Sequence, residues 1–408
     1  MNKFLAFFIC FFICLPAWTC LAATSGATIS IYLDADMTGA NASGVSIERG
    51  IRTALSQVDN KLAGYSVEIR ILDHRGNSAR SLANLKTFLA DPYAFVLFTG
   101  LHSPPLLAHR QFINENKILT LDPWAAAGPI TRPPDDNNWI FRLSIDDSKA
   151  GGVIVRRAVD ERGFISPALL LENTGWGKSN QKTMTANLSD RGIEPARIVW
   201  FDWGLTETSA RIMLRNIKAS GADVIFLVAN APEGKNVCRA MCELPPSERL
   251  PIVSHWGITG GDFPEVITAY IRDKIDLEFI QTSFSFLNMG DAPFPNTVFQ
   301  RAASLFQDVK TPKDIKASTG FIHAYDLTRL LIAAVKQAGM SKNMLENRTR
   351  VRAALENLKK PVQGLIKIYE RPFKPYSISD KDAHEALGTD DFTFGRYGEN
   401  NEVILIRQ

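Results

Sequence analysis

The sequence predicts an α/β protein with two doubly wound, Rossmann-like lobes, each built on a parallel sheet. From residue 28 onward, short apolar runs alternate with amphipathic stretches of helical period, and strands separated by helices pair in parallel. The same rhythm starts again after residue 147. Polar and aromatic residues follow many of the apolar runs, at the strand end where open parallel sheets place their ligands. These three observations indicate two lobes with a small-molecule site.

The elements of the first lobe follow from apolar runs that are bounded by turn residues. Its strands are expected at 29–33, 65–72, 94–98, 118–121 and 139–143. The helical spacing of apolar residues predicts helices at 44–58 and 78–90. A third helix is expected after 94–98, with Ser103 as its N-cap and Pro104 at the first helical position, because each residue type is favoured there.

The second set of elements repeats this pattern, although no sequence repeat relates the two sets. Its strands are expected at 168–171, 197–201, 224–228, 252–253 and 278–282. Its helices are expected at 148–161, 179–190, 208–219 and 233–243. The rest of the chain is predicted to be more helical, with helices at 296–306, 317–337 and 344–358 and strand-like segments at 364–369, 392–397 and 403–406.

The composition is that of an ordinary globular protein. The chain has 408 residues, of which 45% are hydrophobic and 22% are charged, so it is long enough for two domains. Its formal net charge of +3 is small and evenly distributed along the chain. This balance argues against nucleic acid or an acidic membrane surface as a partner.

The N-terminal segment and the cysteines indicate export. Residues 1–22 carry Lys3 before an apolar core and end in small residues, as a secretory signal peptide does. We therefore expect a periplasmic protein. Of the five cysteines, only Cys238 and Cys242 lie beyond this segment. They are four residues apart in a helical pattern, where a disulfide would be strained, so we expect two small buried residues.

Motifs for catalysis, nucleotide binding and metal binding do not fit the chain. Gly177-Lys178-Ser179 resembles the end of a phosphate-binding loop, but Glu172 stands where that loop needs its leading glycine. The six histidines are scattered, without a shared metal-ligand spacing. Asp34 and Asp36 are expected to be solvated charges at a strand end. The sequence therefore predicts a protein that is not an enzyme and holds no cofactor or metal.

Seven loops of one kind follow the predicted strands and would converge on the cleft between the lobes. They are 36–39, 101–103, 124–126, 146–147, 175–177, 229–231 and 254–257. Three of these loops contain a tryptophan, which suits a ligand with a flat apolar body. The candidate ligand-binding residues are His102, Ser103, Trp124, Ala125, Ala126, Asp147, Trp176, Asn230, His255 and Trp256.

The order and spacing of these residues resemble the type 1 periplasmic binding proteins, in particular the leucine/isoleucine/valine-binding group that serves ABC importers. The resemblance runs from Ile29 to about Tyr369. It rests on Met37-Thr38-Gly39, Asp73 with Asn77 and Ala79, Ser103, Pro123-Trp124-Ala125-Ala126, Arg142 with Asp147, Trp176-Gly177, Gly221-Ala222-Asp223 and the helix containing Tyr325.

The resemblance implies two discontinuous lobes joined by three crossovers. Lobe 1 would comprise 28–146 and 285–364, and lobe 2 would comprise 147–284 and 365–408. It also implies a receptor that closes on a small-molecule ligand by a hinge motion and is then recognised by an ABC transporter permease. We expect a monomer. A ligand-sensing receptor for a membrane signalling partner is the alternative function.

The resemblance also implies roles for individual residues. Ser103 corresponds to the serine that holds the ligand carboxylate, and Trp176 to an aromatic residue that covers the ligand. Asn230 stands where a second aromatic residue is usual, Trp256 where amino-acid binders have an acid, and Ala126 where they have a threonine. A buried ammonium group without such partners costs roughly several kcal/mol. We therefore expect a small carboxylate or aromatic ligand rather than a free α-amino acid.

Overall fold

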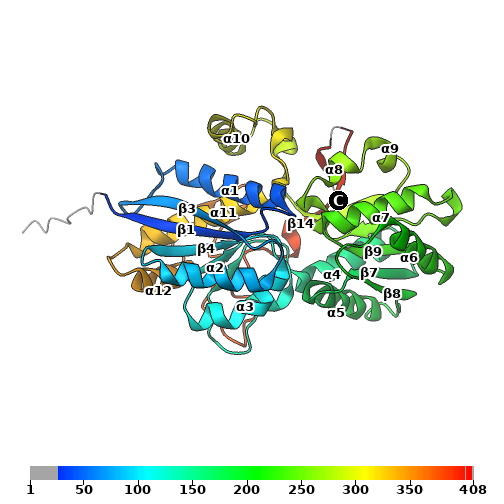
Figure 1. Ribbon diagram of the computed structural model, residues 1–408, viewed down its shortest axis with the longest axis horizontal. Helices are drawn as coiled ribbons and strands as arrows, with labels where there is room; N and C mark the ends of the chain where they lie inside the picture. Colours follow the sequence, from blue (N-terminus) through cyan, green and yellow to red (C-terminus); the bar gives the residue numbers. More distant parts are fainter. Residues whose placement is uncertain (1–25, 400, 407–408) are drawn as a thin grey trace, which may run out of the picture.

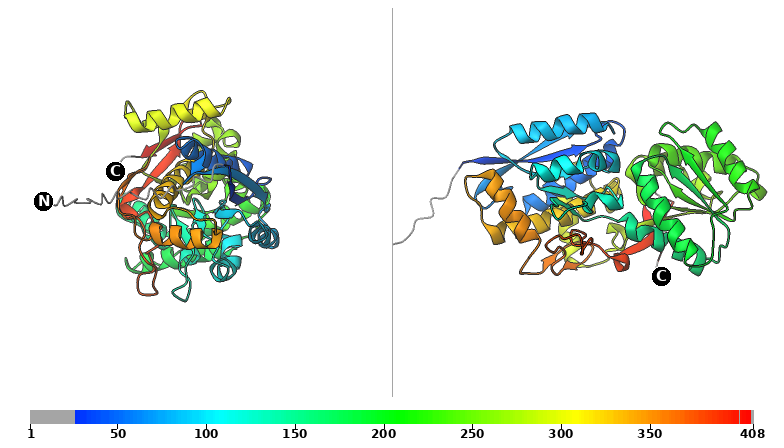
Figure 2. Two further views of the ribbon diagram at one scale, coloured as in Figure 1. Left: turned by 90° about the vertical axis from the view of Figure 1, so that its left-hand side faces the viewer. Right: turned by 90° about the horizontal axis from the view of Figure 1, so that it is seen from below.

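Two lobes lie side by side in the computed structural model, which describes residues 26–399 and 401–406 (Figures 1 and 2). The expected signal segment, 1–22, lies outside the described residues. Within the described ranges, no helix is long and apolar enough to span a bilayer. Each lobe has a central sheet covered by helices, which confirms the α/β fold class with doubly wound lobes.

The sheet of the first lobe has the order β2-β3-β1-β4-β5-β6, and all pairs except β2–β3 are parallel. Its strands are β1 (Thr28–Ala35), β2 (Lys61–Leu62), β3 (Tyr65–Asp73), β4 (Ala94–Thr99), β5 (Thr120–Asp122) and β6 (Ile140–Arg142). Every residue of β4 is buried. This is the pattern of a parallel strand with both faces covered, and it explains the continuous apolar run AFVLF.

The sheet of the second lobe has the order β15-β14-β11-β10-β9-β7-β8. Its strands are β7 (Pro167–Glu172), β8 (Arg197–Phe201), β9 (Val224–Val228), β10 (Ile252–Ser254), β11 (Leu277–Thr282), β14 (Phe392–Tyr397) and β15 (Val403–Ile406). The strands from β7 to β11 pair in parallel, whereas β14 joins β11 in antiparallel register, with Phe279 opposite Gly395. Both sheets are therefore mixed sheets with a parallel centre.

Helices cover the faces of both sheets (Figure 1). In the first lobe they are α1 (Asn41–Ser56), α2 (Ser78–Ala90), α3 (Ser103–Glu115), α10 (Pro293–Leu305), α11 (Ser318–Ala338) and α12 (Met344–Leu355). In the second lobe they are α4 (Asp147–Val155), α5 (Gly175–Ser189), α6 (Glu207–Ala219), α7 (Ala231–Glu243), α8 (Phe263–Val266) and α9 (Ala269–Arg272). Cys238 and Cys242 lie buried and unbridged on α7, as predicted.

The chain passes between the sheets three times, at 146–147, after Thr282 and at 391–392. The expected division gave 365–408 to lobe 2. In the structure only β14 and β15 of this segment join the second sheet, while residues before them lie against β6. Arg142 N–H donates to His384 O over 2.9 Å, and Ala386 N–H donates to Arg142 O over 2.9 Å. Phe373 packs edge-on against Phe141, with 5.0 Å between the ring centroids.

Several local expectations need correction. The segment predicted as one strand at 364–369 is a hairpin of two short strands, β12 (Val362–Gln363) and β13 (Ile368–Tyr369). Helix α3 has His102, not Ser103, as its N-cap, so that Ser103 is the first helical residue. Helix α5 begins at Gly175, four residues before the expected start, because Thr174 caps it by accepting a hydrogen bond from Gly177 N–H.

Asp34 and Asp36 are buried, contrary to the expectation of solvated charges. Asp34 accepts hydrogen bonds from the Ser81 hydroxyl (2.5 Å) and the Asn84 amide (2.6 Å), and burial raises its pKa to about 6. Asp36 accepts from the Gly39 N–H over 2.7 Å. The partners of Asp34 lie on α2, far along the chain, so the local sequence carries no sign of them.

Candidate functional site

The carboxyl ends of β4 and β5 supply the first-lobe half of the site. The chain after β4 turns into α3 at Ser103, whose Oγ accepts a hydrogen bond from Ala127 N–H over 3.2 Å. This bond ties the start of α3 to the loop that follows β5. In that loop, Trp124 N–H and Ala125 N–H donate to Asp122 Oδ1 over 3.1 and 2.8 Å. Both loops are buried, so their backbones are held before any ligand arrives.

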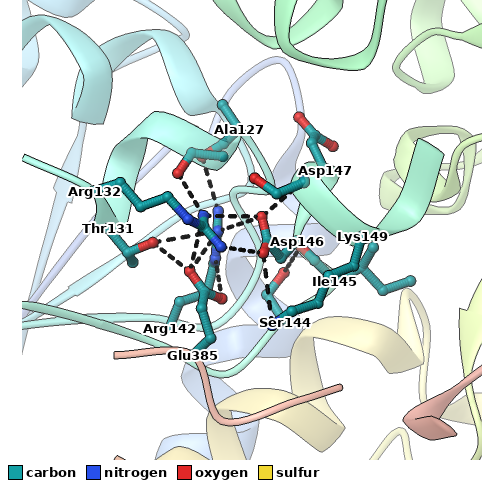
Figure 3. A network of polar contacts seen from close by, with 12 residues as sticks. Ala127, Thr131, Arg132, Arg142, Ser144, Ile145, Asp146, Asp147, Lys149 and Glu385 are labelled. Carbon is teal, nitrogen blue, oxygen red and sulfur yellow. Dashed lines mark hydrogen bonds and ion pairs between the residues drawn. The ribbon is translucent and has the colours of Figure 1, made fainter. Parts of the chain in front are cut away.

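A buried charge network supports the loop of residues 124–127 (Figure 3). The Arg142 guanidinium donates to Ala125 O and Ala127 O over 3.1 and 2.9 Å. It also donates to Glu385, through Nε over 2.9 Å and through Nη2 over 2.6 Å, and to Asp146 over 2.9 Å. Burial disfavours the charge of Arg142, but these two carboxylates hold its pKa above the usual value. The network joins the loop to the crossover at 146–147.

The second lobe contributes the strand ends of β7, β9 and β10. Trp176 lies in the first turn of α5, and its indole packs on Gly257: a Cβ at that glycine would lie 2.6 Å from the ring. Asn230 donates to Glu172 Oε2 over 3.0 Å, and Thr174 donates to Glu172 Oε1 over 3.1 Å. Burial raises the pKa of Glu172. Glu172 was not among the predicted site residues, and both of its carboxylate oxygens already accept hydrogen bonds.

Tryptophans from both lobes meet at the junction. Trp124 and Trp256 are almost fully buried, and their ring centroids are 5.9 Å apart at an interplanar angle of 49°. Trp124 also lies on Gly320 of α11, where a Cβ would approach its ring to 2.8 Å. Trp176 meets His255 edge-on, with 5.1 Å between the centroids. The aromatic residues predicted from the loop pattern are thus brought together.

Two histidines lie among these rings. His255 Nε2 is 2.9 Å from Asp147 Oδ1, and both side chains are fully buried; burial raises the pKa of Asp147. His323 of α11 lies beneath Trp256, with 5.1 Å between the centroids. Its ring nitrogens lie 3.0 Å from Pro123 O and 3.1 Å from Thr282 Oγ1, and burial lowers its pKa to about 3. His323 is therefore neutral at physiological pH.

These residues enclose what we call the inner cavity. It is lined by Leu101, Ser103, Pro104, Trp124, Ala126, Glu172, Trp176, Asn230, Trp256 and Gly257. Its volume of about 10 Å³ has room for about one water molecule. The indole N–H groups of Trp124 and Trp176 and His255 Nδ1 are buried without a hydrogen-bond partner among the described residues. Each such group costs roughly 1–3 kcal/mol, so the junction offers unused donors.

Of the predicted residues, Ser103, Trp124, Ala126, Trp176, Asn230 and Trp256 line the inner cavity. Ala125, Asp147 and His255 are fully buried beside it but are not part of its lining. His102 faces a different space, which we call the outer cavity; its volume is about 180 Å³. There His102 Nε2 lies 3.1 Å from Asp36 Oδ2.

Sequence reasoning missed Glu172, Trp203 and His323. Glu172 is the last residue of β7, and Trp203 comes just after β8. Both lie at the carboxyl end of a strand, which is the position by which the other candidate residues were selected. Trp203 lines the outer cavity, with its ring centroid 5.5 Å from that of His102. His323 lies inside a long helix, and no local pattern distinguishes it from a core residue.

The lobes contact each other around this site. Gly128 N–H, from the 3₁₀ turn Gly128–Thr131 of the first lobe, donates to Ser179 Oγ of α5 over 3.1 Å. The exposed side chains of Lys316, just before α11, and Glu265, on α8, form an ion pair between the lobes. The structure is therefore that of a closed pair of lobes with residues of both enclosing one site.

Comparison with known proteins agrees with this architecture. A family model described as periplasmic binding protein matches residues 28–396. A search of curated proteins finds no match. A type 1 periplasmic binding protein from Bordetella pertussis Tohama I superposes with a TM-score of 0.75 at 18% identity, covering 93% of this chain and 99% of that one.

Two further solved structures have the same fold. A leucine-binding protein from Thermotoga maritima has a TM-score of 0.71 at 16% identity, covering 93% of this chain and 98% of that one. An ABC transporter solute-binding protein from R. palustris, in complex with 4-hydroxybenzoate, has a TM-score of 0.74 at 16% identity, covering 93% and 96%.

Proposed function

The chain belongs to the periplasmic binding protein family, and from this premise we propose that it is an exported solute receptor. It captures a small organic ligand between its lobes and presents the closed form to an ABC importer. The observation that carries this proposal is the convergence of strand-end loops from both lobes on one enclosed site. Ser103 and Trp124 reach it from the first lobe, and Trp176 and Trp256 reach it from the second.

The polar groups of the site favour a ligand with a hydrogen-bond acceptor, such as a carboxylate. The unused groups include the two indole N–H donors of Trp124 and Trp176, whereas the acid of the site, Glu172, is already engaged. Glu172 is the acid of the inner lining, and the Asp147 carboxylate lies beside the lining, 2.9 Å from His255 Nε2. Carboxylates also fit the solved relative that holds 4-hydroxybenzoate. The ligand is therefore an aromatic or other small carboxylate rather than a free α-amino acid.

A thermal-shift screen tests this function. The mature protein is screened against amino acids, aromatic acids, amides and short dicarboxylates. A ligand at a hundred times its Kd adds about 2.7 kcal/mol to the stability, so a true ligand raises the melting temperature further as its concentration increases, in a logarithmic manner. We expect stabilisation by carboxylates and none by leucine. Tight binding of aliphatic amino acids with no response to aromatic acids would contradict the ligand class.

The residue test uses isothermal titration calorimetry on the best compound of the screen. Trp176→Ala should weaken binding at least about tenfold, a loss of about 1.4 kcal/mol, because it removes both a wall and a donor of the inner cavity. Tyr270→Ala is the matched control, since Tyr270 is an exposed aromatic residue of the same lobe and does not line the site. Unchanged affinity in Trp176→Ala would exclude this residue from the site.

A further inference from the structure

The two cavities at the junction differ greatly in size. The inner cavity has a volume of about 10 Å³, because Trp124, Trp176 and Trp256 fill most of the space around Ser103. The outer cavity has a volume of about 180 Å³. Both are lined by Leu101 and Asn230, so they adjoin each other. An aromatic ring cannot enter the inner cavity of the closed lobes, whereas a terminal group of a ligand can reach toward it.

We propose that the body of the ligand lies in the outer cavity, stacked on Trp203, and that only its acceptor end points inward to the Trp124 and Trp176 N–H groups. This inference rests on the proposed function and deepens it, because it places the ligand outside the tryptophan cluster. It makes Trp203 a specificity-determining residue for the part of the ligand beyond its acceptor end.

Trp203 has the surroundings that such a wall requires. It is 45% exposed, while Trp124, Trp176 and Trp256 are at most 5% exposed. It belongs to the second lobe, yet its indole lies against the first: a Cβ at Gly76 would be 3.3 Å from the ring, and His102 is 5.5 Å away between centroids. An open aromatic face that touches the opposite lobe becomes a wall of the cavity only when the lobes are together.

Most charges around the outer cavity are already paired, which defines the chemistry of the ligand body. The pairs are Asp36 with His102 (3.1 Å), Lys235 with Asp262 (2.6 Å) and Arg75 with Asp73 (3.3 Å), and Glu233 accepts from Gly204 N–H (2.9 Å). Leu101, Ala231 and Pro232 add apolar surface beside Trp203. Glu233 has no ion-pair partner among the described residues, and its negative charge disfavours an anionic ligand body. The body of the ligand is therefore flat and uncharged.

Together the two cavities indicate a two-ended ligand: an aryl carboxylate whose planar, uncharged part extends beyond the first ring. Three probes separate this ligand from a single-ring acid. Benzoate has the acceptor end and one ring, 4-phenylbenzoate adds a second planar ring, and 4-cyclohexylbenzoate adds a saturated ring of similar length. Calorimetry on the full mature chain should give at least about tenfold tighter binding of 4-phenylbenzoate than of benzoate, with 4-cyclohexylbenzoate between them, since stacking needs a flat partner.

The variant Trp203→Ala should weaken 4-phenylbenzoate more than benzoate and so reduce the advantage of 4-phenylbenzoate to within about twofold, because the longer flat body loses more stacking than a single ring does. Trp203→Phe should keep part of the advantage, and Tyr270→Ala should keep all of it. Circular dichroism confirms that each variant is folded.

Equal binding of benzoate and 4-phenylbenzoate by the wild type would overturn the outer site. Equal weakening of both acids in Trp203→Ala would also overturn it, because the indole would then act on lobe closure rather than on the second ring. If no compound of the solute screen binds, the proposed function itself fails, and this inference fails with it. Binding of single-ring acids with no gain from a second ring leaves the function standing and removes only the outer site.

Discussion

The inner and outer cavities use tryptophan in opposite ways. In the inner cavity Trp124 packs on Trp256, the three indoles also pack on glycines or buried histidines, and they leave about 10 Å³. In the outer cavity a single indole lies at the edge of about 180 Å³ and keeps much of its surface exposed. The same residue type is core in one place and an exposed cavity wall in the other. The difference shows that aromatic content alone does not locate the ligand.

The largest effect should come from removing an inner tryptophan. Trp256→Ala deletes a buried ring, so it should lower the free energy of unfolding by roughly 3–5 kcal/mol. Trp203→Ala deletes a ring that is 45% exposed and should cost under about 1 kcal/mol. Urea unfolding followed by far-UV circular dichroism measures both. Equal losses in the two variants would show that the inner and outer indoles do not differ as the structure indicates.

The next effect concerns the network beneath the inner cavity. Arg142→Met leaves Glu385 and Asp146 buried with one partner fewer, and breaking a buried ion pair costs about 3–5 kcal/mol. The matched control, Arg75→Met, removes an arginine of the outer cavity whose side chain is 56% exposed, and it should cost under about 1 kcal/mol. The same urea titration compares them. A mild effect of Arg142→Met would mean that the loop of residues 124–127 does not depend on this guanidinium.

A smaller effect should appear only with pH. The unfolded His323 takes up a proton near its ordinary pKa of 6.5, whereas the folded residue does so near 3. The unfolded state therefore binds more protons as the pH falls below 6.5, and the folded state loses stability. From pH 7 to pH 5 this loss is about 2 kcal/mol. The wild type should lose about that much more than His323→Gln over this interval. Parallel pH profiles would show that His323 is not a buried neutral ring.

Much of the fold could be predicted from the local sequence, because parallel strands that are covered on both faces have continuous apolar sequences. The predicted strands 224–228 and 197–201 coincide with β9 and β8. Helix starts were less accurate: Thr174 caps α5 through its side-chain oxygen, four residues before the expected start, and His102 is the N-cap of α3 without a side-chain hydrogen bond. The segment 365–408 was predicted to belong to the second lobe, and the contacts of its residues before β14 with β6 depend on residues far away in the chain.

The site was predictable only as far as its residues share a position after a strand. The position after a strand predicted that Ser103, Trp124 and Trp176 share one site, and they line one cavity. The same criterion applied to β8 would have identified Trp203. It could not tell which indoles would be buried, because burial depends on glycines such as Gly257 and Gly320 on other elements. Nor could it place His323, whose role depends on the crossing of α11 beneath the second-lobe loop.

The late crossover of the chain at 391–392 has a consequence for synthesis. The first lobe needs α11, whose backbone at Phe321 packs directly on Gly50 of α1, and the second needs β14 to cover the outer edge of β11. A growing polypeptide can therefore complete the first lobe only after the segment that pairs with β6 has been made, long after the second lobe has begun. Loss of β14 and β15 would remove strands from the second sheet alone, whereas a loss that reaches back beyond residue 384 would damage both lobes.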